Sequence, residues 1–183
     1  MSNTHKHKTT HNKIKDYNDS TKLISCSIIT ELRPFQKSLE DMYLDNTVKG
    51  KIYWIFDSIG KTGKTEFIKY MNIKYKVPFS YGYKKVDIIS IIFKNKNYIL
   101  NNEHVAIIYD FGKNTNVDKI SYSSIEQVSE GAISSSRFKN GCFIYNCPNI
   151  FILSNVLPNK NKITNSKWLI YTINNNLELI QIK

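Results

Sequence analysis

The chain has 183 residues, of which 41% are apolar and 22% charged. This length and composition exclude a wholly disordered chain and fit one domain with a buried core. The formal charge of +11 points to an anionic partner, nucleic acid before a membrane surface. However, all but two of the 26 basic residues are lysines, and lysine codons are AT-rich. A solvated surface that favours general solubility is therefore an equally good explanation of the charge.

No part of the sequence predicts a membrane-spanning segment. The apolar runs over 105–109 and 150–153 are far shorter than the ~20 residues that a spanning helix needs. The polar N-terminus does not resemble a secretory signal peptide. The three cysteines form no CxxC pair, which favours a reducing compartment. We therefore expect a soluble intracellular protein, located in the host nucleus if the protein is viral.

The composition divides the chain into two parts. Residues 1–30 predict a basic, flexible tail, and residues 31–183 predict a single globular domain. Three histidines in the tail could hold a metal, but no fourth ligand accompanies them, so a solvated tail is the simpler interpretation. The domain begins with an expected helix from Pro34 to about Asp45, because a proline fits the first turn and the apolar residues that follow share one face.

Apolar runs and helical patterns alternate along the rest of the domain. The expected buried strands cover residues 51–56, 104–109 and 149–154. A helix is expected to start over 64–70 and another to cover 122–130, and the apolar run 86–93, whose type is ambiguous, is better explained as a helix than as a strand because of its length and its place between strands. Asn140-Gly141 predicts a β-hairpin over 136–145, and 168–173 with 177–182 predict a closing hairpin. Non-alternating strands separated by helices predict an α/β fold with a mainly parallel sheet flanked by helices.

A glycine-containing loop between the first strand and its helix predicts a phosphate-binding loop. Backbone N–H groups around Gly60 and Gly63 would surround phosphate oxygens at the N-terminus of a helix. Lys64 would reach the β- and γ-phosphates of ATP, and the Thr65 hydroxyl would hold Mg²⁺. The full spacing G-x-x-x-x-G-K-[ST] requires glycine at Ser58, so a lysine-rich surface loop remains the alternative. The candidate nucleotide-binding residues are Gly60, Lys61, Thr62, Gly63, Lys64 and Thr65.

Two further strands end in polar residues that suit the same chemistry. Asp110 follows a buried strand and could hold Mg²⁺, although a lone aspartate at a strand end is commonly a turn former. Asn155 follows another strand and could contact the γ-phosphate or the attacking water, although such a residue is more often part of a loop. If the three strands are neighbours, Thr65, Asp110 and Asn155 surround one triphosphate.

The order of these motifs resembles the superfamily 3 helicase domain of replication-associated (Rep) proteins from small circular single-stranded DNA viruses and their satellites. The similarity covers roughly residues 31–170. The segments that carry it are Leu32-Arg33-Pro34-Phe35-Gln36, Trp54 to Asp57, Gly60 to Thr65, Ile107 to Phe111, Tyr122 to Glu126, Gly131 to Phe138 and Pro148 to Pro158.

This resemblance implies an AAA+-like P-loop core that forms a homo-oligomeric ring, commonly a hexamer, around nucleic acid. Single-stranded DNA is favoured over RNA, although ring helicases of both kinds share these motifs. Lys64 and Thr65 match Walker A, Asp110 matches Walker B, and Asn155 matches the motif C sensor. The DNA-contacting hairpin of the family falls on residues 135–145, which makes Arg137, Phe138 and Lys139 candidates for strand contact. A purely structural hairpin is an equally good interpretation.

The chain departs from the family pattern in two respects. About 30 residues precede the helicase-like part, and His5-Lys6-His7 has lysine where the nuclease metal motif needs an apolar residue, so we expect no nicking activity. The arginine-finger segment reads Thr164 to Trp168, with Lys167 in the arginine position. A lysine cannot form the bidentate contacts of an arginine, and the loss of a finger can cost ~10³ in hydrolysis rate.

The sequence therefore predicts an ATP-dependent helicase domain with catalytic residues Lys64, Asp110, Asn155 and Lys167, the last acting from a neighbouring subunit. The alternative is a truncated, catalytically weak or inactive P-loop protein that still binds nucleic acid, motivated by Asp57, Ser58 and Lys167. A small P-loop kinase is a third class. It is disfavoured because a kinase lid needs catalytic arginines, and the chain has only Arg33 and Arg137.

Overall fold

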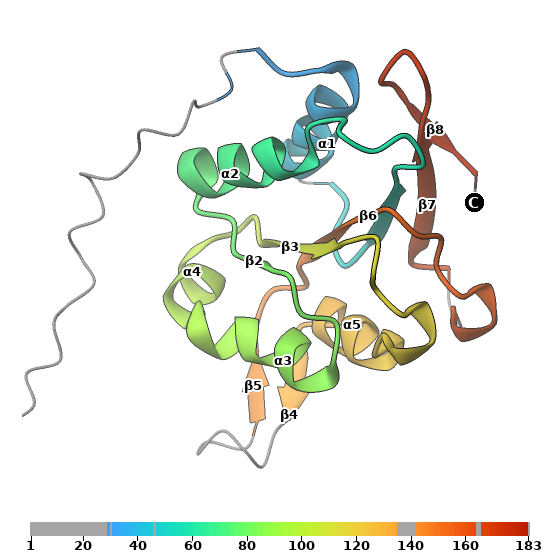
Figure 1. Cartoon of the computed structure of the whole chain (residues 1–183). Coiled ribbons are helices and arrows are strands. Elements are labelled where there is room, and N and C mark those ends of the chain that lie inside the picture. Colours follow the sequence, from blue (N-terminus) through green and yellow to red (C-terminus); the bar gives the residue numbers. More distant parts are fainter. Residues whose placement is uncertain (1–28, 30, 46, 135–141, 164–165, 183) are drawn as a thin grey trace, which may run out of the picture.

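A computed structural model describes residues 29, 31–45, 47–134, 142–163 and 166–182 (Figure 1). The predicted tail lies almost entirely outside these residues and stays a prediction. The elements in chain order are α1 (Pro34–Leu44), β1 (Ile52–Phe56), α2 (Lys64–Tyr75), β2 (Phe79–Ser80), α3 (Lys85–Lys94), α4 (Lys96–Asn101), β3 (Ala106–Phe111), the 3₁₀ turn η2 (Val117–Lys119), α5 (Tyr122–Ser129), β4 (Ala132–Ser134), β5 (Cys142–Ile144), β6 (Asn149–Ser154), η3 (Lys160–Lys162), β7 (Trp168–Ile173) and β8 (Leu179–Gln181).

Six strands form one sheet in the order β2-β3-β6-β1-β7-β8. All neighbouring pairs are parallel except β7 and β8, which form the predicted closing hairpin. β1 lies between β6 and β7, with Trp54 level with Ile152 on one side and Ile170 on the other. The predicted α/β class with a mainly parallel sheet flanked by helices is thus confirmed.

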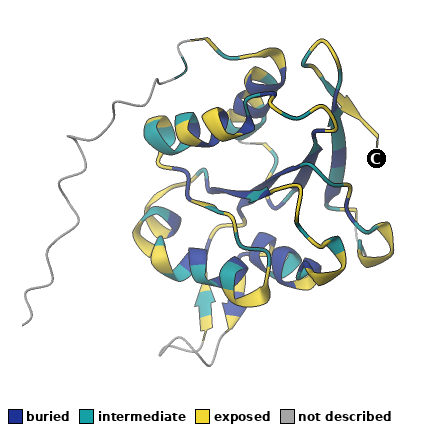
Figure 2. Cartoon of the chain, viewed as in Figure 1, coloured by how far each residue is buried: buried dark blue, intermediate teal, exposed yellow. Residues whose placement is uncertain are grey.

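The sheet separates two apolar clusters, because successive side chains of a strand point to opposite faces. On one face Tyr53 and Ile55 pack with residues of α1 and α2, including Phe35 and Phe67. On the other face Ile52 and Trp54 pack with residues of α3, α4 and α5. Buried strands between the two helical layers explain why the strand sequences are continuously apolar rather than alternating (Figure 2).

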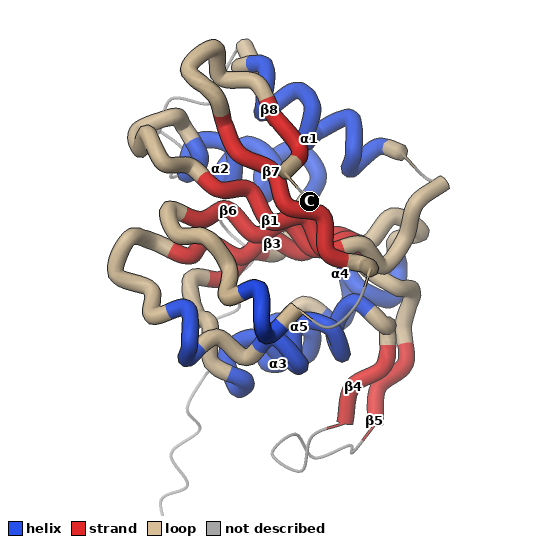
Figure 3. Tube along the Cα trace, turned by 90° about the vertical axis from the view of Figure 1, so that its right-hand side faces the viewer, coloured by secondary structure: helices blue, strands red, loops and turns tan. Residues whose placement is uncertain are grey.

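The structure differs from the sequence prediction in several elements. The edge strand β2 and the short helix α4 were not predicted, and α2, of which only the start over 64–70 was predicted, continues to Tyr75. Asp110 lies inside β3 rather than after it. The first strand of the predicted hairpin begins at Ala132 and not at residue 136, and its connecting residues 135–141 lie outside the described part of the chain. β4 and β5 stand away from the six-stranded sheet (Figure 3).

Gly131 ends α5, as predicted, and permits the close return of the chain after β5. Its φ is +73°, and a Cβ at this position would lie 2.3 Å from the Tyr145 carbonyl oxygen. Within the described residues, no helix is both long and apolar enough to cross a membrane.

Candidate functional site

Three loops at the carboxyl edge of the sheet enclose one open cleft. They follow β1, β3 and β6, and the empty volume between them is about 850 Å³, including the mouth. Ligands of open parallel sheets bind at this edge, and small-molecule sites have comparable size. Lys64, Thr65, Asp110 and Asn155, which were predicted to act together, share this cleft. The residues that line it are Lys61, Thr62, Gly63, Lys64, Thr65, Glu66, Asp110, Gly112 and Asn155.

The loop between β1 and α2 makes repeated left-handed turns. Gly60, Lys61 and Gly63 have φ values of +76°, +58° and +99°. Among the described residues, none accepts a hydrogen bond from the backbone N–H of Lys61, Thr62 or Gly63. Left-handed residues in a turn arrange N–H groups as a concave, anion-attracting surface, and the N-terminus of α2 adds the positive end of its dipole. The loop can therefore surround an anion.

Asp57 occupies the base of this loop and holds the side chain of Lys64. The aspartate is 1% exposed, and its carboxylate accepts hydrogen bonds from Lys64 Nζ, from Gly60 N at 2.8 Å and from Thr62 Oγ1 at 2.7 Å. Burial alone would raise the pKa of Asp57, but these donors and the Lys64 charge outweigh burial and lower it. Asp57 is thus ionised at neutral pH, and Lys64 already has an anionic partner.

Asp110 faces the same cleft from β3 and is more weakly held. No described residue donates a hydrogen bond to its carboxylate. Burial raises the pKa of Asp110 above its ordinary 3.8, and the nearby Lys64 charge only partly opposes this. A half-buried carboxylate without a hydrogen-bond donor is suited to a hard cation such as Mg²⁺, which prefers oxygen ligands.

Asn155 joins the ends of β6 and β1. Its side-chain Nδ2 donates to the Asp57 carbonyl oxygen at 2.9 Å, and its backbone N–H donates to the Phe111 carbonyl oxygen at 3.2 Å. Its amide oxygen accepts no hydrogen bond from the described residues. The side chain is therefore fixed by its nitrogen and offers an oxygen to a molecule in the cleft.

Helix α1 contacts the loop from outside the cleft. Arg33 Nη1 donates to the Thr62 carbonyl oxygen, and Gln36 Nε2 donates to the Gly63 carbonyl oxygen at 2.9 Å. Gln36 is 1% exposed, and its Oε1 accepts from Arg33 N at 2.9 Å. A Cβ on Gly63 would lie 3.0 Å from Gln36 Nε2 and 3.2 Å from Arg33 Nη1, so glycine permits this close approach.

A buried carboxylate fastens the same helix to α2. Glu40 is 3% exposed and accepts hydrogen bonds from Tyr70 Oη at 2.6 Å, Tyr75 Oη at 2.8 Å and Lys74 Nζ at 2.9 Å. Burial opposes its ionisation, but these donors outweigh burial and lower the pKa of Glu40 to about 2. α1 is thus anchored along its length to the helix that carries Lys64 and Thr65.

Lys167, predicted as the finger residue, does not join this cleft. It precedes β7 at the amino edge of the sheet, the opposite edge, where its Nζ lies 3.3 Å from Glu130 Oε1. A contribution to catalysis would therefore have to reach the cleft of another copy. Arg137, Phe138 and Lys139, the predicted strand contacts, lie outside the described residues.

Sequence reasoning missed the three residues that shape the loop from behind. Arg33 and Gln36 were noticed only within the family-like segment, and Asp57 only as a departure from it. An arginine and a glutamine three residues apart at a proline-led helix start can face one partner, and an aspartate after a buried strand often orders a turn. Neither pattern identifies the residue that is contacted, because Arg33 binds Thr62, 29 residues later, and Gln36 binds Gly63, 27 residues later.

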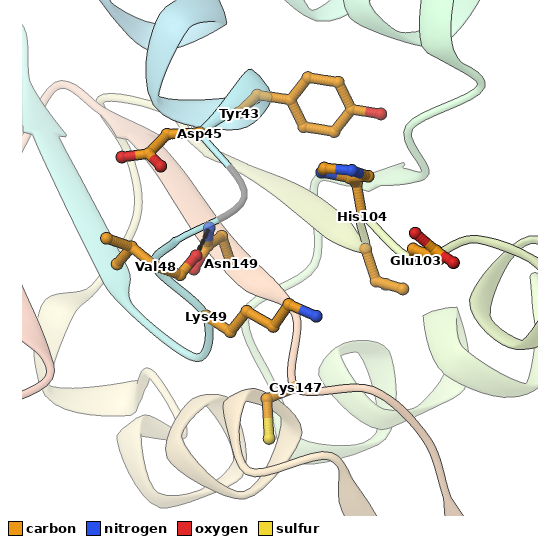
Figure 4. A pocket seen from close by; sticks show the side chains of 9 residues that line it. Tyr43, Asp45, Val48, Lys49, Glu103, His104, Cys147 and Asn149 are labelled. Carbon is orange, nitrogen blue, oxygen red and sulfur yellow. Dashed lines mark hydrogen bonds between the residues drawn. The ribbon is translucent and has the colours of Figure 1, made fainter.

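A second depression lies at the amino edge of the sheet (Figure 4). Asp45, Glu103, His104 and Cys147 lie around it and would be plausible metal ligands by type. Among the described residues, however, no three histidine, cysteine or acidic side chains are grouped closely enough to hold a metal. The carboxyl-edge cleft is therefore the better candidate for chemistry.

The fold and the cleft define an α/β protein with a mainly parallel sheet and a polar, anion-attracting cleft at its carboxyl edge. Comparison with known proteins finds distant similarity to Para-Rep C9 of the Faba bean necrotic yellows C9 alphasatellite, 26% identical over 117 residues. These residues are 63% of this chain and 39% of that protein, so the chain spans less than half of its length. No family profile matches the chain. The chain is thus distantly related to a satellite Rep protein.

Proposed function

We propose that this protein is a P-loop ATPase of the Rep superfamily 3 helicase type, which binds Mg·ATP in the carboxyl-edge cleft. The convergence of Lys64, Thr65, Asp110 and Asn155 on that cleft carries the proposal. The distant similarity to a satellite Rep protein supports it. The fold that this function requires is an AAA+-like core, with which the observed strand order and the position of the loop after β1 are compatible.

The residues of the cleft fit a triphosphate with its metal. The unpaired N–H groups of Lys61, Thr62 and Gly63 bind phosphate oxygens, and Lys64 leaves Asp57 to reach the β- and γ-phosphates. The Thr65 hydroxyl and the Asp110 carboxylate would hold Mg²⁺. When bound, Mg²⁺ neutralises the charge that develops on the phosphates. The free amide oxygen of Asn155 orients the attacking water or senses the γ-phosphate.

In this proposal ATP hydrolysis drives movement along single-stranded nucleic acid, with DNA favoured over RNA. The protein acts as a ring of identical subunits, with six as the expected number. Lys167 reaches the cleft of the neighbouring subunit, and Arg137, Phe138 and Lys139 contact the strand. The net charge of +11 supports an anionic polymer as partner.

A second candidate is a nucleotide- and nucleic-acid-binding protein without turnover. Two contacts favour it: Lys64 is held by Asp57, and Lys167, a lysine in the finger position, is paired with Glu130. If only the finger limits hydrolysis, Lys167→Arg raises the rate sharply. If the wild type hydrolyses ATP, this second candidate is excluded.

The test is ATP hydrolysis by the purified protein, with and without single-stranded DNA, beside a measurement of molecular mass in solution. We expect hydrolysis that single strands stimulate and that Lys64→Ala abolishes. Lys69→Ala, which removes an exposed lysine of the same helix that does not line the cleft, is the matched control and leaves turnover unchanged. Unchanged turnover in Lys64→Ala would contradict the proposal.

A further inference from the structure

We infer that Arg33 and Gln36 are positioning residues that set the direction of the phosphate-binding N–H groups from behind the loop. This inference rests on the proposed nucleotide binding and deepens it. Neither side chain is among the residues that line the cleft. Both instead donate hydrogen bonds to carbonyl oxygens of the loop, at Thr62 and Gly63.

The geometry of the peptide bond converts these contacts into amide orientation. A trans peptide is planar, so its C=O and N–H groups point in opposite directions. Holding the Thr62 carbonyl against α1 turns the N–H of Gly63 away from α1. In the same way, the contact from Gln36 to the Gly63 carbonyl turns the N–H of Lys64 away from α1. Thr62, Gly63 and Lys64 all line the cleft, so these two N–H groups are available to an anion there.

The two contacts differ in how strongly the loop depends on them. The Gly63 carbonyl also accepts the first hydrogen bond of α2, from Phe67 N at 3.1 Å, so Gln36 is its second donor. The Thr62 carbonyl has Arg33 as its donor among the described residues. Thr62 precedes a glycine with φ of +99°, a residue that can readily adopt other conformations. Loss of Arg33 should therefore reorient the loop more than loss of Gln36.

The position of α1 itself is fixed independently of the loop. Phe35 N donates to the Leu177 carbonyl oxygen at 2.7 Å, in the connection between β7 and β8. Glu40 binds Tyr70, Lys74 and Tyr75 of α2. Arg33 and Gln36 thus project from a helix that is held near its start and at its middle, which is what a positioning residue requires.

The experiment compares Arg33→Gln and Gln36→Met with Glu40→Gln, a variant of the same helix that lowers stability but removes no contact to the loop and leaves the Phe35–Leu177 contact of α1 in place. The measurements are thermal unfolding and dissociation constants, by calorimetry, for Mg·ADP and for inorganic tripolyphosphate. Tripolyphosphate lacks the base, so it reports the phosphate contacts alone.

We expect Arg33→Gln to weaken the binding of Mg·ADP and of tripolyphosphate equally, by about 10-fold, and Gln36→Met to weaken both equally but less, because the lost alignment affects phosphates and not the base. Glu40→Gln should lower the unfolding temperature at least as much, yet leave both constants within about twofold of wild type. Arg33→Lys keeps a donor for the Thr62 carbonyl and should restore most of the affinity.

Equal binding by Arg33→Gln, Gln36→Met and wild type would overturn the inference. The inference would also be overturned if Glu40→Gln lost as much affinity as Arg33→Gln and Gln36→Met for the same fall in unfolding temperature. If the wild type binds and Lys64→Ala does not, such a result defeats the positioning role and leaves the proposed function intact. If the wild type binds neither ligand, the proposed function fails and the positioning role fails with it.

Discussion

Replacing Asp57 with asparagine tests whether the Asp57 carboxylate and a bound phosphate compete for the side chain of Lys64. In the ligand-free protein the Asp57 carboxylate holds Lys64 Nζ, Gly60 N and Thr62 Oγ1. Asparagine keeps one oxygen of similar size and position, so it can retain a neutral contact to the loop. It removes the charge-assisted contact to Lys64 and frees the lysine for a phosphate.

The structure sets the size of both effects. A hydrogen bond to a charged group contributes about 1.5–3 kcal/mol. Lys64 is 8% exposed and borders the cleft, so water can partly replace its lost partner. We therefore expect Asp57→Asn to lower the free energy of unfolding by about 2 kcal/mol. Because Lys64 no longer has to leave a carboxylate, Mg·ADP should bind about 10-fold more tightly, which is 1.4 kcal/mol.

The assay is calorimetric binding of Mg·ADP together with urea unfolding, at pH 7. Thr62→Val is the matched control, since it removes one hydrogen bond to Asp57 and leaves the ion pair. It should cost about 1 kcal/mol of stability without any gain in affinity. Weaker binding by Asp57→Asn, similar to that of Lys64→Ala, would refute the reasoning. It would mean that the Asp57 charge builds the loop rather than retaining the lysine.

Three further predictions follow from single groups in and behind the site. Asp110→Asn should bind ADP with an affinity that Mg²⁺ no longer improves. In the wild type the Mg²⁺ effect should weaken with falling pH while the pH is still above 3.8, the ordinary pKa of an aspartate, because burial raises the pKa of Asp110; an Mg²⁺ effect that stays constant down to pH 3.8 would contradict this. Glu40→Gln should cost about 2 kcal/mol at pH 7 in urea unfolding. The pKa of Glu40 is lowered from 4.5 to about 2, so the stability that its carboxylate contributes is fully present above pH 4.5 and is lost as the pH falls toward 2. A difference in unfolding free energy between wild type and Glu40→Gln that stays constant from pH 7 to pH 2 would contradict this. Lys61→Gly should change stability by less than about 1 kcal/mol, whereas Lys61→Val should cost about 2 kcal/mol, because the Lys61 φ of +58° suits glycine and is unfavourable for a β-branched residue. If thermal unfolding shows Lys61→Val to be as stable as Lys61→Gly, the backbone at this position is not strained.

Much of the fold was predictable because buried parallel strands are continuously apolar. The patterns located both ends of β1, β3 and β6 to within two residues, and the polar residues at their carboxyl ends could be expected to meet. The two-residue strand β2 gave no pattern, because so short an edge strand needs no apolar run. Residues 132–134 were missed as a strand, since a three-residue strand with only Ile133 buried shows too little alternation.

The contacts that shape the site could not be predicted in the same way. The sequence marked Lys64 as a candidate from its neighbours, but its partner Asp57 follows from the backbone path of the loop. Arg33 and Gln36 reach the loop only because α1 packs beside α2, through contacts that local patterns do not encode. Local sequence thus identified the side chains that face the cleft, while tertiary packing determined what holds them.

The central claim is that a triphosphate occupies the carboxyl-edge cleft, and its location can be measured directly. We would titrate the uniformly ¹⁵N-labelled protein with Mg²⁺ and a non-hydrolysable ATP analogue and follow every backbone amide by NMR. We predict the largest shifts at Lys61, Thr62, Gly63 and Lys64, with smaller shifts at Asn155. Shifts confined to the amino edge of the sheet, around the lysine-rich groove of Lys49, Lys51 and Lys167, would contradict it.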